Sequence, residues 1–187
     1  MLQKKDKEKI LFFRESIFKV AELIFNYPNK TFHIRELTRK TNFSTTAVTK
    51  AIEELNKYNI VTIETTQLTK NVKANLESEE YRFYKLVFNL YRLEKYNIIN
   101  ILISEYRPEA IVLFGSFAKG EDTENSDIDI LVITPGKEIK EINIEKLEKE
   151  FNRKINLHIL QNIEKSSTEF KNSIANGIVL YGYIKVI

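Results

Sequence analysis

Two aspartates separated by a single residue, Asp127 and Asp129, are the side chains of this sequence best suited to chemistry. The run Asp-Ile-Asp-Ile-Leu-Val-Ile that contains them is typical of a strand, in which alternate side chains share a face. Both carboxylates then point the same way, and their repulsion disfavours the fold unless a cation lies between them. The chain contains no cysteine, so the expected ligands are oxygen atoms and the expected metal is Mg²⁺ or Mn²⁺.

A second group of residues has the features of a phosphate-binding turn. Gly115 and Ser116 follow the apolar run 110–114, which is predicted to be a buried strand, and precede a predicted short helix. Glycine lets a phosphate approach the backbone, and a helix N-terminus supplies free N–H groups. Lys119 and Ser126 complete the predicted nucleotide-binding set. A phosphate cradle beside paired carboxylates predicts phosphoryl or nucleotidyl transfer.

The stretch GSFAKGEDTENSDIDILV resembles the signature of the DNA polymerase β-like nucleotidyltransferase superfamily in its minimal form. In that pattern a hydrophobic strand leads to Gly-Ser, and a spacer of about ten residues leads to Asp-x-Asp on a second strand. The resemblance covers residues 111–183. It implies that Asp127 and Asp129 are the catalytic carboxylates and hold two metal ions, and that Gly115 and Ser116 hold the triphosphate.

The sequence departs from this family at the expected third carboxylate. Active members carry it on a neighbouring strand, and the matching strand here is residues 154–160, with Asn156 and His158 on one face. Asn156 could bind water or coordinate weakly. His158 could act as a base, as a ligand for a softer metal, or as a structural residue. Three acidic residues between the Gly-Ser pair and the aspartates could compensate, although a solvated loop is the simpler expectation for them: Glu121, Asp122 and Glu124.

The first part of the chain reads as helices at residues 10–26, 33–40 and 45–58, followed by strands at 60–66 and 72–76. This order resembles the winged helix-turn-helix domains of bacterial and archaeal regulators. The recognition helix would begin at Thr45 and would reach double-stranded DNA. The alternative is that its polar residues face solvent and that the domain serves dimerisation. The predicted DNA-binding residues are Arg35, Thr45, Thr46, Thr49, Lys50, Lys70 and Lys73.

The order of elements predicts an α+β protein in three segments. A winged helix-turn-helix rich in helix would occupy residues 1–76, a connecting helix residues 77–107, and a small α/β nucleotidyltransferase domain with a mixed sheet residues 108–187. In the last segment we expect strands at 110–114, 127–133, 154–160 and 178–183. The helices expected between them are 138–152 and 163–175.

Composition favours a cytoplasmic protein without a membrane segment. The 187 residues include no cysteine, which excludes a disulfide framework. No apolar run approaches the roughly 20 residues of a membrane span, and the charged N-terminus does not resemble a secretory signal. Residues 1–74 hold 14 basic against 8 acidic side chains, whereas the remainder holds 15 against 18. A basic first part suits a polyanion, and a slightly acidic second part suits a metal site.

These patterns predict a metal-dependent enzyme that transfers a nucleoside monophosphate from a nucleoside triphosphate to an acceptor hydroxyl, coupled to a DNA-binding domain. By analogy with related minimal domains, the acceptor could be a small helical partner protein. The alternative is a non-enzymatic DNA-binding regulator whose C-terminal domain senses a nucleotide or forms a homodimer. The missing third acid favours the regulator, and the intact aspartate pair favours retained nucleotide binding.

Overall fold

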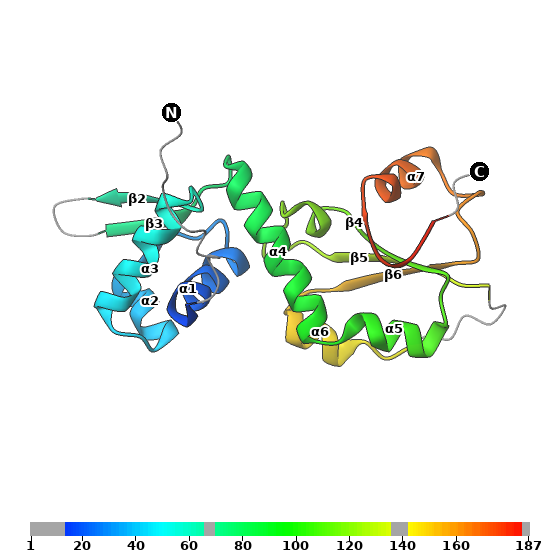
Figure 1. The fold of residues 1–187 in the computed structure, drawn as a ribbon, viewed down its shortest axis with the longest axis horizontal. Helices are drawn as coiled ribbons and strands as arrows, with labels where there is room; N and C mark the ends of the chain where they lie inside the picture. Colours follow the sequence, from blue (N-terminus) through cyan, green and yellow to red (C-terminus); the bar gives the residue numbers. More distant parts are fainter. Residues whose placement is uncertain (1–13, 66–69, 136–141, 185–187) are drawn as a thin grey trace, which may run out of the picture. The chain divides into compact units, whose positions relative to one another are not determined.

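The computed structural model describes residues 14–65, 70–135 and 142–184 (Figure 1). The chain divides into two compact units, residues 1–81 and residues 82–187. Among the described residues, no helix combines the length and the apolar character that crossing a membrane requires.

The N-terminal unit consists of helices packed on a small antiparallel sheet. The helices are α1 (Glu15–Asn26), α2 (Ile34–Thr41) and α3 (Thr45–Lys57). The strands are β1 (Phe32–His33), β2 (Val61–Thr65) and β3 (Lys70–Ala74), and the sheet has the order β1-β3-β2. The two-residue strand β1 is too short to leave a periodic pattern, so the sequence does not predict it. The part of the first predicted helix before residue 14 lies outside the described residues.

Local signals explain where these helices begin and end. The Ser44 side chain accepts a hydrogen bond from the Ala47 backbone N–H at 3.2 Å and so caps the N-terminus of α3. Asn42 ends α2 in the left-handed conformation with φ of 59°, a geometry that asparagine tolerates better than most residues. The apolar residues spaced at helical periods form the core of this unit, for example Val20, Ile24, Leu37, Val48, Ile52 and Leu55.

The connecting helix expected within residues 77–107 is two helices, α4 (Glu79–Lys95) and α5 (Ile98–Tyr106). Asn97 adopts the left-handed conformation with φ of 56° between them. A left-handed residue is incompatible with a continuous right-handed helix, so the expectation of one uninterrupted helix is wrong. The apolar periodicity continues across the break because both helices contribute to the same core, through Leu93 and Leu102.

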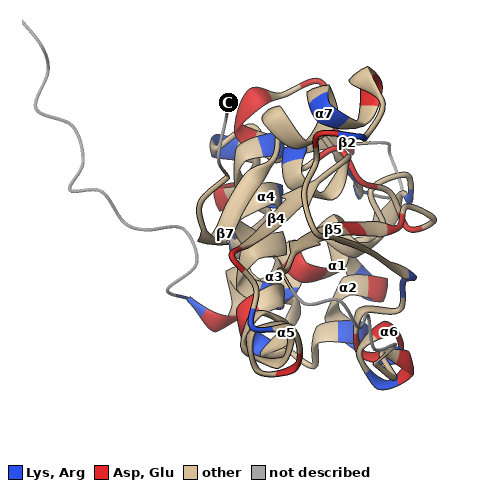
Figure 2. Cartoon of the chain, turned by 90° about the vertical axis from the view of Figure 1, so that its right-hand side faces the viewer, with Lys and Arg blue, Asp and Glu red and all other residues tan. Residues whose placement is uncertain are grey.

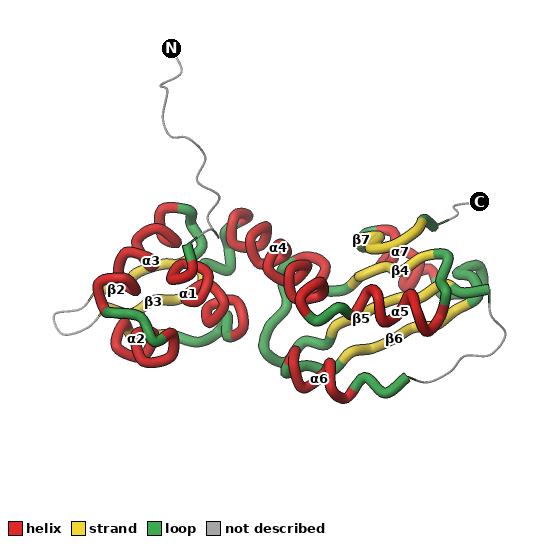
Figure 3. Tube along the Cα trace, turned by 60° about the horizontal axis from the view of Figure 1, so that its bottom comes forward, coloured by secondary structure: helices red, strands yellow, loops and turns green. Residues whose placement is uncertain are grey.

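The C-terminal unit is built on a mixed four-stranded sheet of order β6-β5-β4-β7 (Figure 3). Its strands are β4 (Ala110–Phe114), β5 (Ile128–Ile133), β6 (Ile155–Leu160) and β7 (Ile178–Gly182). Strand β4 pairs antiparallel with both neighbours, and β5 pairs parallel with β6. The parallel pair requires a crossover connection, which here contains α6 (Glu145–Phe151). The mixed sheet and the α+β class agree with the sequence analysis.

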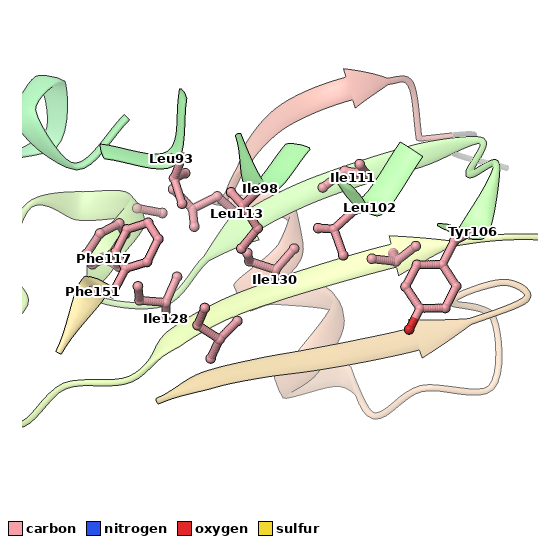
Figure 4. Packing of buried hydrophobic residues seen from close by; sticks show 13 residues of the cluster. Leu93, Ile98, Leu102, Tyr106, Ile111, Leu113, Phe117, Ile128, Ile130 and Phe151 are labelled. Atoms are coloured by element: carbon pink, nitrogen blue, oxygen red, sulfur yellow. The ribbon is translucent and has the colours of Figure 1, made fainter. Parts of the chain in front are cut away.

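Helices cover both faces of this sheet (Figure 3). Residues from α4, α5 and α6 pack on one face around Leu113 and Ile130, and Figure 4 shows this cluster. Helix α7 (Thr168–Ala175) packs on the other face through Ile174, against Val112 and Leu131. The short helix α6 carries acidic and basic side chains next to one another, as a solvated outer surface does (Figure 2). The sheet is buried most completely at β4 and β5, and β5 begins directly after Asp127 and contains Asp129.

Candidate functional site

Asp127, Asp129 and Asn156 converge at one end of the β5–β6 pair. Asp127 directly precedes β5, and Asp129 lies opposite Asn156 in the parallel register. The Asn156 side-chain Nδ2 donates to Asp129 Oδ1 at 3.0 Å and to Asp127 Oδ2 at 3.2 Å. The two carboxylates therefore point at one position, and the side-chain amide of Asn156 occupies it. Asn156 is exposed to solvent.

Gly115 brings the backbone against this pair. It follows Phe114, which pairs with Asp129 in the antiparallel register, and it adopts a positive φ of 74°. A Cβ atom at position 115 would lie 2.5 Å from Asp129 Oδ2. Both the backbone conformation and the lack of space require glycine here. The fold thus joins the Gly-Ser turn to the carboxylates, from which it is separated by more than ten residues along the chain.

The helix that follows the Gly-Ser turn is short, as the sequence predicts. The expected helix after Gly115 is a three-residue 3₁₀ helix, η2 (Phe117–Lys119), in which the Lys119 N–H donates to the Ser116 carbonyl. Gly120 ends it with φ of 69°, and a Cβ atom at Gly120 would overlap the Arg82 carbonyl oxygen of α4. A helix of three residues has few aligned peptide groups, so a helix dipole adds little to phosphate binding here.

The remaining predicted nucleotide-binding residues differ in their surroundings. Lys119 is exposed to solvent at the end of η2. Ser126 directs its hydroxyl inward, where its Oγ accepts a hydrogen bond from the Thr123 N–H at 2.9 Å. The Ser116 hydroxyl makes no capping hydrogen bond to the described residues of η2. Of the two serines, Ser116 therefore has the freer hydroxyl, and Ser126 holds the loop before Asp127.

The two candidates on β6 occupy different environments. Asn156 contacts the carboxylates, whereas the ring of His158 packs against the rings of Phe114 and Phe170, with its centroid 5.3 Å from each of theirs. Phe114 and Phe170 also contact each other at 5.5 Å. An imidazole in such a group contributes packing, which is the structural alternative considered for His158. Asn156 is accordingly the residue of β6 that faces the aspartate pair.

A buried charged cluster supports the loop between β4 and β5, and the sequence did not predict it. Asp122, expected in a solvated loop, is 2% exposed. Its Oδ2 lies 3.1 Å from Lys85 Nζ and 3.0 Å from a guanidinium nitrogen of Arg153, and its Oδ1 accepts from Asn89 Nδ2 at 2.7 Å. Burying a carboxylate requires such partners, so the expectation of a solvated loop is wrong for Asp122. Glu121 on its N-terminal side is exposed, as expected.

Two of the partners of Asp122, Lys85 and Asn89, could have been suspected from their spacing on α4. Lys85, Asn89 and Arg92 recur at intervals of four and three residues, which places them on one helix face. Arg92 donates to the carbonyl oxygens of Phe151, at 2.8 Å, and Glu150 at the end of α6. A polar stripe on a helix that also has an apolar face is usually taken as its solvated side, and only the fold shows that it is buried.

Burial lowers the pKa of Lys85 to about 8. The attraction of Asp122 opposes this shift, and the positive charges of Arg153 and Arg92 add to it. The cluster of Lys85, Arg153 and Asp122 carries one excess positive charge when Lys85 is protonated. The ammonium form of Lys85 is therefore the form that burial disfavours, and it is lost under mildly alkaline conditions.

The donor set at the aspartate pair fits a divalent cation of the magnesium type, although it is weaker than a three-carboxylate site. Among the described residues, no group of three or more His, Cys, Asp and Glu side chains could hold a metal. Asp127 and Asp129 nevertheless direct hard oxygen atoms to one exposed point. Rotation of the Asn156 amide would exchange its NH₂ group for its oxygen, which is a neutral ligand. The site would then offer two negative charges to a metal ion.

The predicted DNA-binding residues lie on α2, α3 and the β2–β3 pair of the N-terminal unit. Thr45, Thr46 and Lys50 are exposed on α3, and Thr49 is half-buried. Arg35 on α2 and Lys70 at the start of β3 are exposed. The Lys73 ammonium is engaged across the strands, at 2.9 and 3.1 Å from the carboxylate oxygens of Glu64. Within the part of the chain that the structure describes, Lys73 thus differs from Lys50 and Lys70 in having a carboxylate partner.

Residues 96–184 match the protein-family model described as "Polymerase beta, Nucleotidyltransferase". Three curated proteins of Methanocaldococcus jannaschii are also similar to the chain. "Putative protein adenylyltransferase MJ1379" is 59% identical over 32 residues, which are 17% of this chain and 32% of that protein. "Putative protein adenylyltransferase MJ0604" is 54% identical over 37 residues, which are 19% of this chain and 37% of that protein. "Putative protein adenylyltransferase MJ0128" is 56% identical over 32 residues, which are 17% of this chain and 33% of that protein.

The chain spans about a third of the length of the curated relatives that it matches. No solved structure matches it. The family model supports a nucleotidyltransferase domain in the C-terminal unit.

Proposed function

We propose that the C-terminal unit transfers a nucleoside monophosphate, with adenosine monophosphate the first choice, from a nucleoside triphosphate to a hydroxyl group of a protein. One observation carries this proposal. Gly115 approaches the Asp129 carboxylate so closely that no side chain fits between them, while Asp127 and Asp129 converge on one exposed point. A phosphate chain lying along the Gly115–Ser116 backbone would therefore meet the carboxylate pair. The names of the relatives supply the protein acceptor and the adenylyl group.

The residues of the site have separable roles in this proposal. Gly115 gives the phosphates access to the backbone, and the Ser116 hydroxyl donates a hydrogen bond to a phosphate oxygen. Asp127 and Asp129 would hold Mg²⁺ or Mn²⁺, which would neutralise charge on the triphosphate. Lys119, exposed at the end of η2, is within the same turn and supplies a positive charge for the outgoing phosphates.

The transfer exchanges one phosphorus–oxygen bond for another. The acceptor oxygen forms a bond to the α-phosphorus, and the bond from the α-phosphorus to the bridging oxygen breaks. Pyrophosphate leaves with the electron pair of that bond, and the proton of the acceptor hydroxyl passes to solvent. Asn156 carries no carboxylate to receive this proton, so we expect slow transfer compared with enzymes that have a general base at this position.

Incubation of the purified chain with labelled ATP, Mg²⁺ or Mn²⁺ and a cell lysate tests this function. Label on a protein band that disappears with Asp127→Asn supports the proposal. Glu121→Gln is the matched control, because it removes an exposed carboxylate from the same loop and should leave labelling unchanged. Absence of labelling with each of the four common nucleoside triphosphates would refute transfer, and calorimetry would then show whether a nucleotide still binds.

We further propose that the N-terminal unit is a winged helix-turn-helix that binds double-stranded DNA. The order α1-β1-α2-α3-β2-β3 and the antiparallel β2–β3 pair support this assignment. Helix α3 would be the recognition helix, and its exposed Thr45, Thr46 and Lys50 would face the major groove. Lys70 would contact phosphate from the wing. A mobility shift that weakens steeply with added salt would support this role.

The second candidate function is a DNA-binding regulator without transfer activity. The hydrogen bonds from Asn156 to both aspartates favour it, because they satisfy the carboxylates without a metal ion. In this case the C-terminal unit would bind a nucleotide and change the affinity of the chain for DNA. DNA affinity measured with and without ATP separates the two candidates: a regulator responds to the nucleotide without labelling any protein, and a transferase labels its acceptor.

A further inference from the structure

The loop that joins Gly115 to Asp127 is attached to the rest of the C-terminal unit at several points along its length. Asn89 Nδ2 donates to the Phe117 carbonyl oxygen at 2.9 Å as well as to Asp122. Gly120 lies against the backbone of α4. Arg153 donates from one guanidinium nitrogen to the Ser126 carbonyl at 3.1 Å and to the Thr123 carbonyl. These contacts leave little freedom to either end of the loop.

Arg153 connects the loop to the strand that carries Asn156. One guanidinium nitrogen pairs with Asp122 at 3.0 Å. The other donates hydrogen bonds to the carbonyl oxygens of Thr123 and Ser126, and Ser126 directly precedes Asp127. Arg153 itself precedes β6 by two residues, and the backbone is further joined where the Ile128 N–H donates to the Lys154 carbonyl at 2.9 Å. The buried guanidinium of Arg153 is therefore one of the groups that set the position of Asp127 relative to Asn156, together with the backbone pairing of β5 and β6.

We propose that Lys85, Asn89 and Arg153 are positioning residues of the nucleotide site, which act through Asp122 to fix the loop that carries Ser116 and Asp127. The inference rests on the proposed function for the identity of the site. None of the three side chains is placed to touch a nucleotide, since all are buried beneath the loop. Groups that orient the ligands of a metal or phosphate site commonly change its affinity by one to two orders of magnitude when removed.

Lys85→Met separates positioning from simple stabilisation. The cluster holds two cations and one anion, so a neutral side chain of similar length leaves Asp122 paired with Arg153 and removes the excess charge. The variant should fold with an unchanged or higher melting temperature at pH 7. The loop should nevertheless lose one attachment. We expect amide protection in residues 117–127 to fall about tenfold and Mn²⁺–ATP affinity to fall about tenfold.

Lys85→Met should also change how amide protection in the loop depends on pH. Asp122, Arg153 and Arg92 are the charged groups that face Lys85. Opening of the loop would hydrate Lys85 and return its pKa from about 8 toward the ordinary value of 10.5, so loss of the proton favours the closed loop. Amide protection in the loop of the unmodified chain, corrected for the intrinsic pH dependence of exchange, should therefore increase between about pH 8 and 10.5. This step should be absent in Lys85→Met. Lys95→Met is the matched control, since it removes a lysine from an exposed position of the same helix.

Hydrogen exchange followed by mass spectrometry, together with Mn²⁺–ATP titration, gives the decisive comparison. Reduced protection confined to residues 117–127, with normal melting and with the pH step removed, establishes positioning. Protection equal to that of Lys95→Met overturns the inference, and so does a general loss across β4 and β5 with a lower melting temperature. If the unmodified chain binds neither Mn²⁺ nor ATP, the proposed function fails, whereas the exchange data still decide whether Lys85 positions the loop.

Discussion

Gly115 and the carboxylate of Asp129 lie closer together than a side chain at position 115 would permit, because a Cβ atom there would be 2.5 Å from Asp129 Oδ2. The two residues come from neighbouring strand ends, β4 and β5, whose antiparallel register pairs Phe114 with Asp129. A site assembled in this way has no spare volume at the glycine, and even a methyl group there should disturb it.

Gly115→Ala should destabilise the protein and abolish nucleotide binding. Alanine at a φ of 74° costs about 1–2 kcal/mol from backbone strain, and its methyl group would displace the Asp129 carboxylate. Thermal unfolding measures the first effect, and ATP titration with Mn²⁺ measures the second. Ala118→Gly, which changes a residue of η2 without adding atoms, is the control for general loosening of the turn. Normal ATP affinity in Gly115→Ala would contradict a phosphate position at this backbone.

Asn156→Asp should create a three-carboxylate site with a higher affinity for divalent cations. The new carboxylate would replace the amide group that now donates hydrogen bonds to Asp127 and Asp129, so it would face both of their carboxylates. We expect Mn²⁺ affinity to rise by about tenfold or more, and the metal-free protein to be less stable because three carboxylates repel. If the chain is a transferase, labelling of the acceptor should also become faster. Asn152→Asp, at an exposed position just before β6, is the control for added charge.

The free energy of unfolding should rise as the pH increases from about 8 to 10.5. In the folded protein the pKa of Lys85 is about 8, below the ordinary value of 10.5. Within this interval the unfolded chain binds more protons than the folded chain, so higher pH favours the folded state. Below about pH 8 Lys85 is protonated in both states, and its contribution no longer changes with pH. Lys85→Met should show a flatter profile over this interval, as measured by urea unfolding at a series of pH values.

Asp122→Asn should destabilise the protein far more than Lys85→Met does. It removes the carboxylate that faces both Lys85 and Arg153, and removing one partner of a buried ion pair costs about 3–5 kcal/mol. Chemical unfolding at pH 7 measures both variants. Equal effects of the two substitutions would show that the excess positive charge of the cluster is screened by water. The double variant Asp122→Asn, Lys85→Met should recover part of the lost stability.

In the N-terminal unit, Lys50→Ala and Lys70→Ala should each reduce the salt dependence of DNA binding by about one unit of the log–log slope. Lys73→Ala should have a smaller effect, because the Lys73 ammonium already contacts Glu64. Fluorescence anisotropy at several salt concentrations provides the slopes. Lys57→Ala, at the exposed C-terminal end of α3, is the matched control. An unchanged slope in Lys50→Ala would contradict the placement of α3 against DNA.

The sequence predicts the strands and the helices that have clear periodicity, and it also predicts which strand ends form the candidate site. Alternation places Asp127 and Asp129 together, and the apolar run of β4 identifies a central strand. The break at Asn97 could not be predicted, because one residue changes the backbone without changing the apolar pattern. The burial of Asp122 was missed for a different reason. Its partners come from distant segments, α4 and the start of β6, and a charged side chain is assigned to solvent until its partners are known.

The attachment of the Gly115–Asp127 loop has a thermodynamic consequence. A free loop loses conformational entropy when a ligand orders it, and that loss subtracts from the binding free energy. Here the contacts of Asn89, Asp122 and Arg153 order the loop when the unit folds. The binding of a nucleotide should then involve little additional ordering, and its heat capacity change should reflect only the apolar surface that the ligand covers.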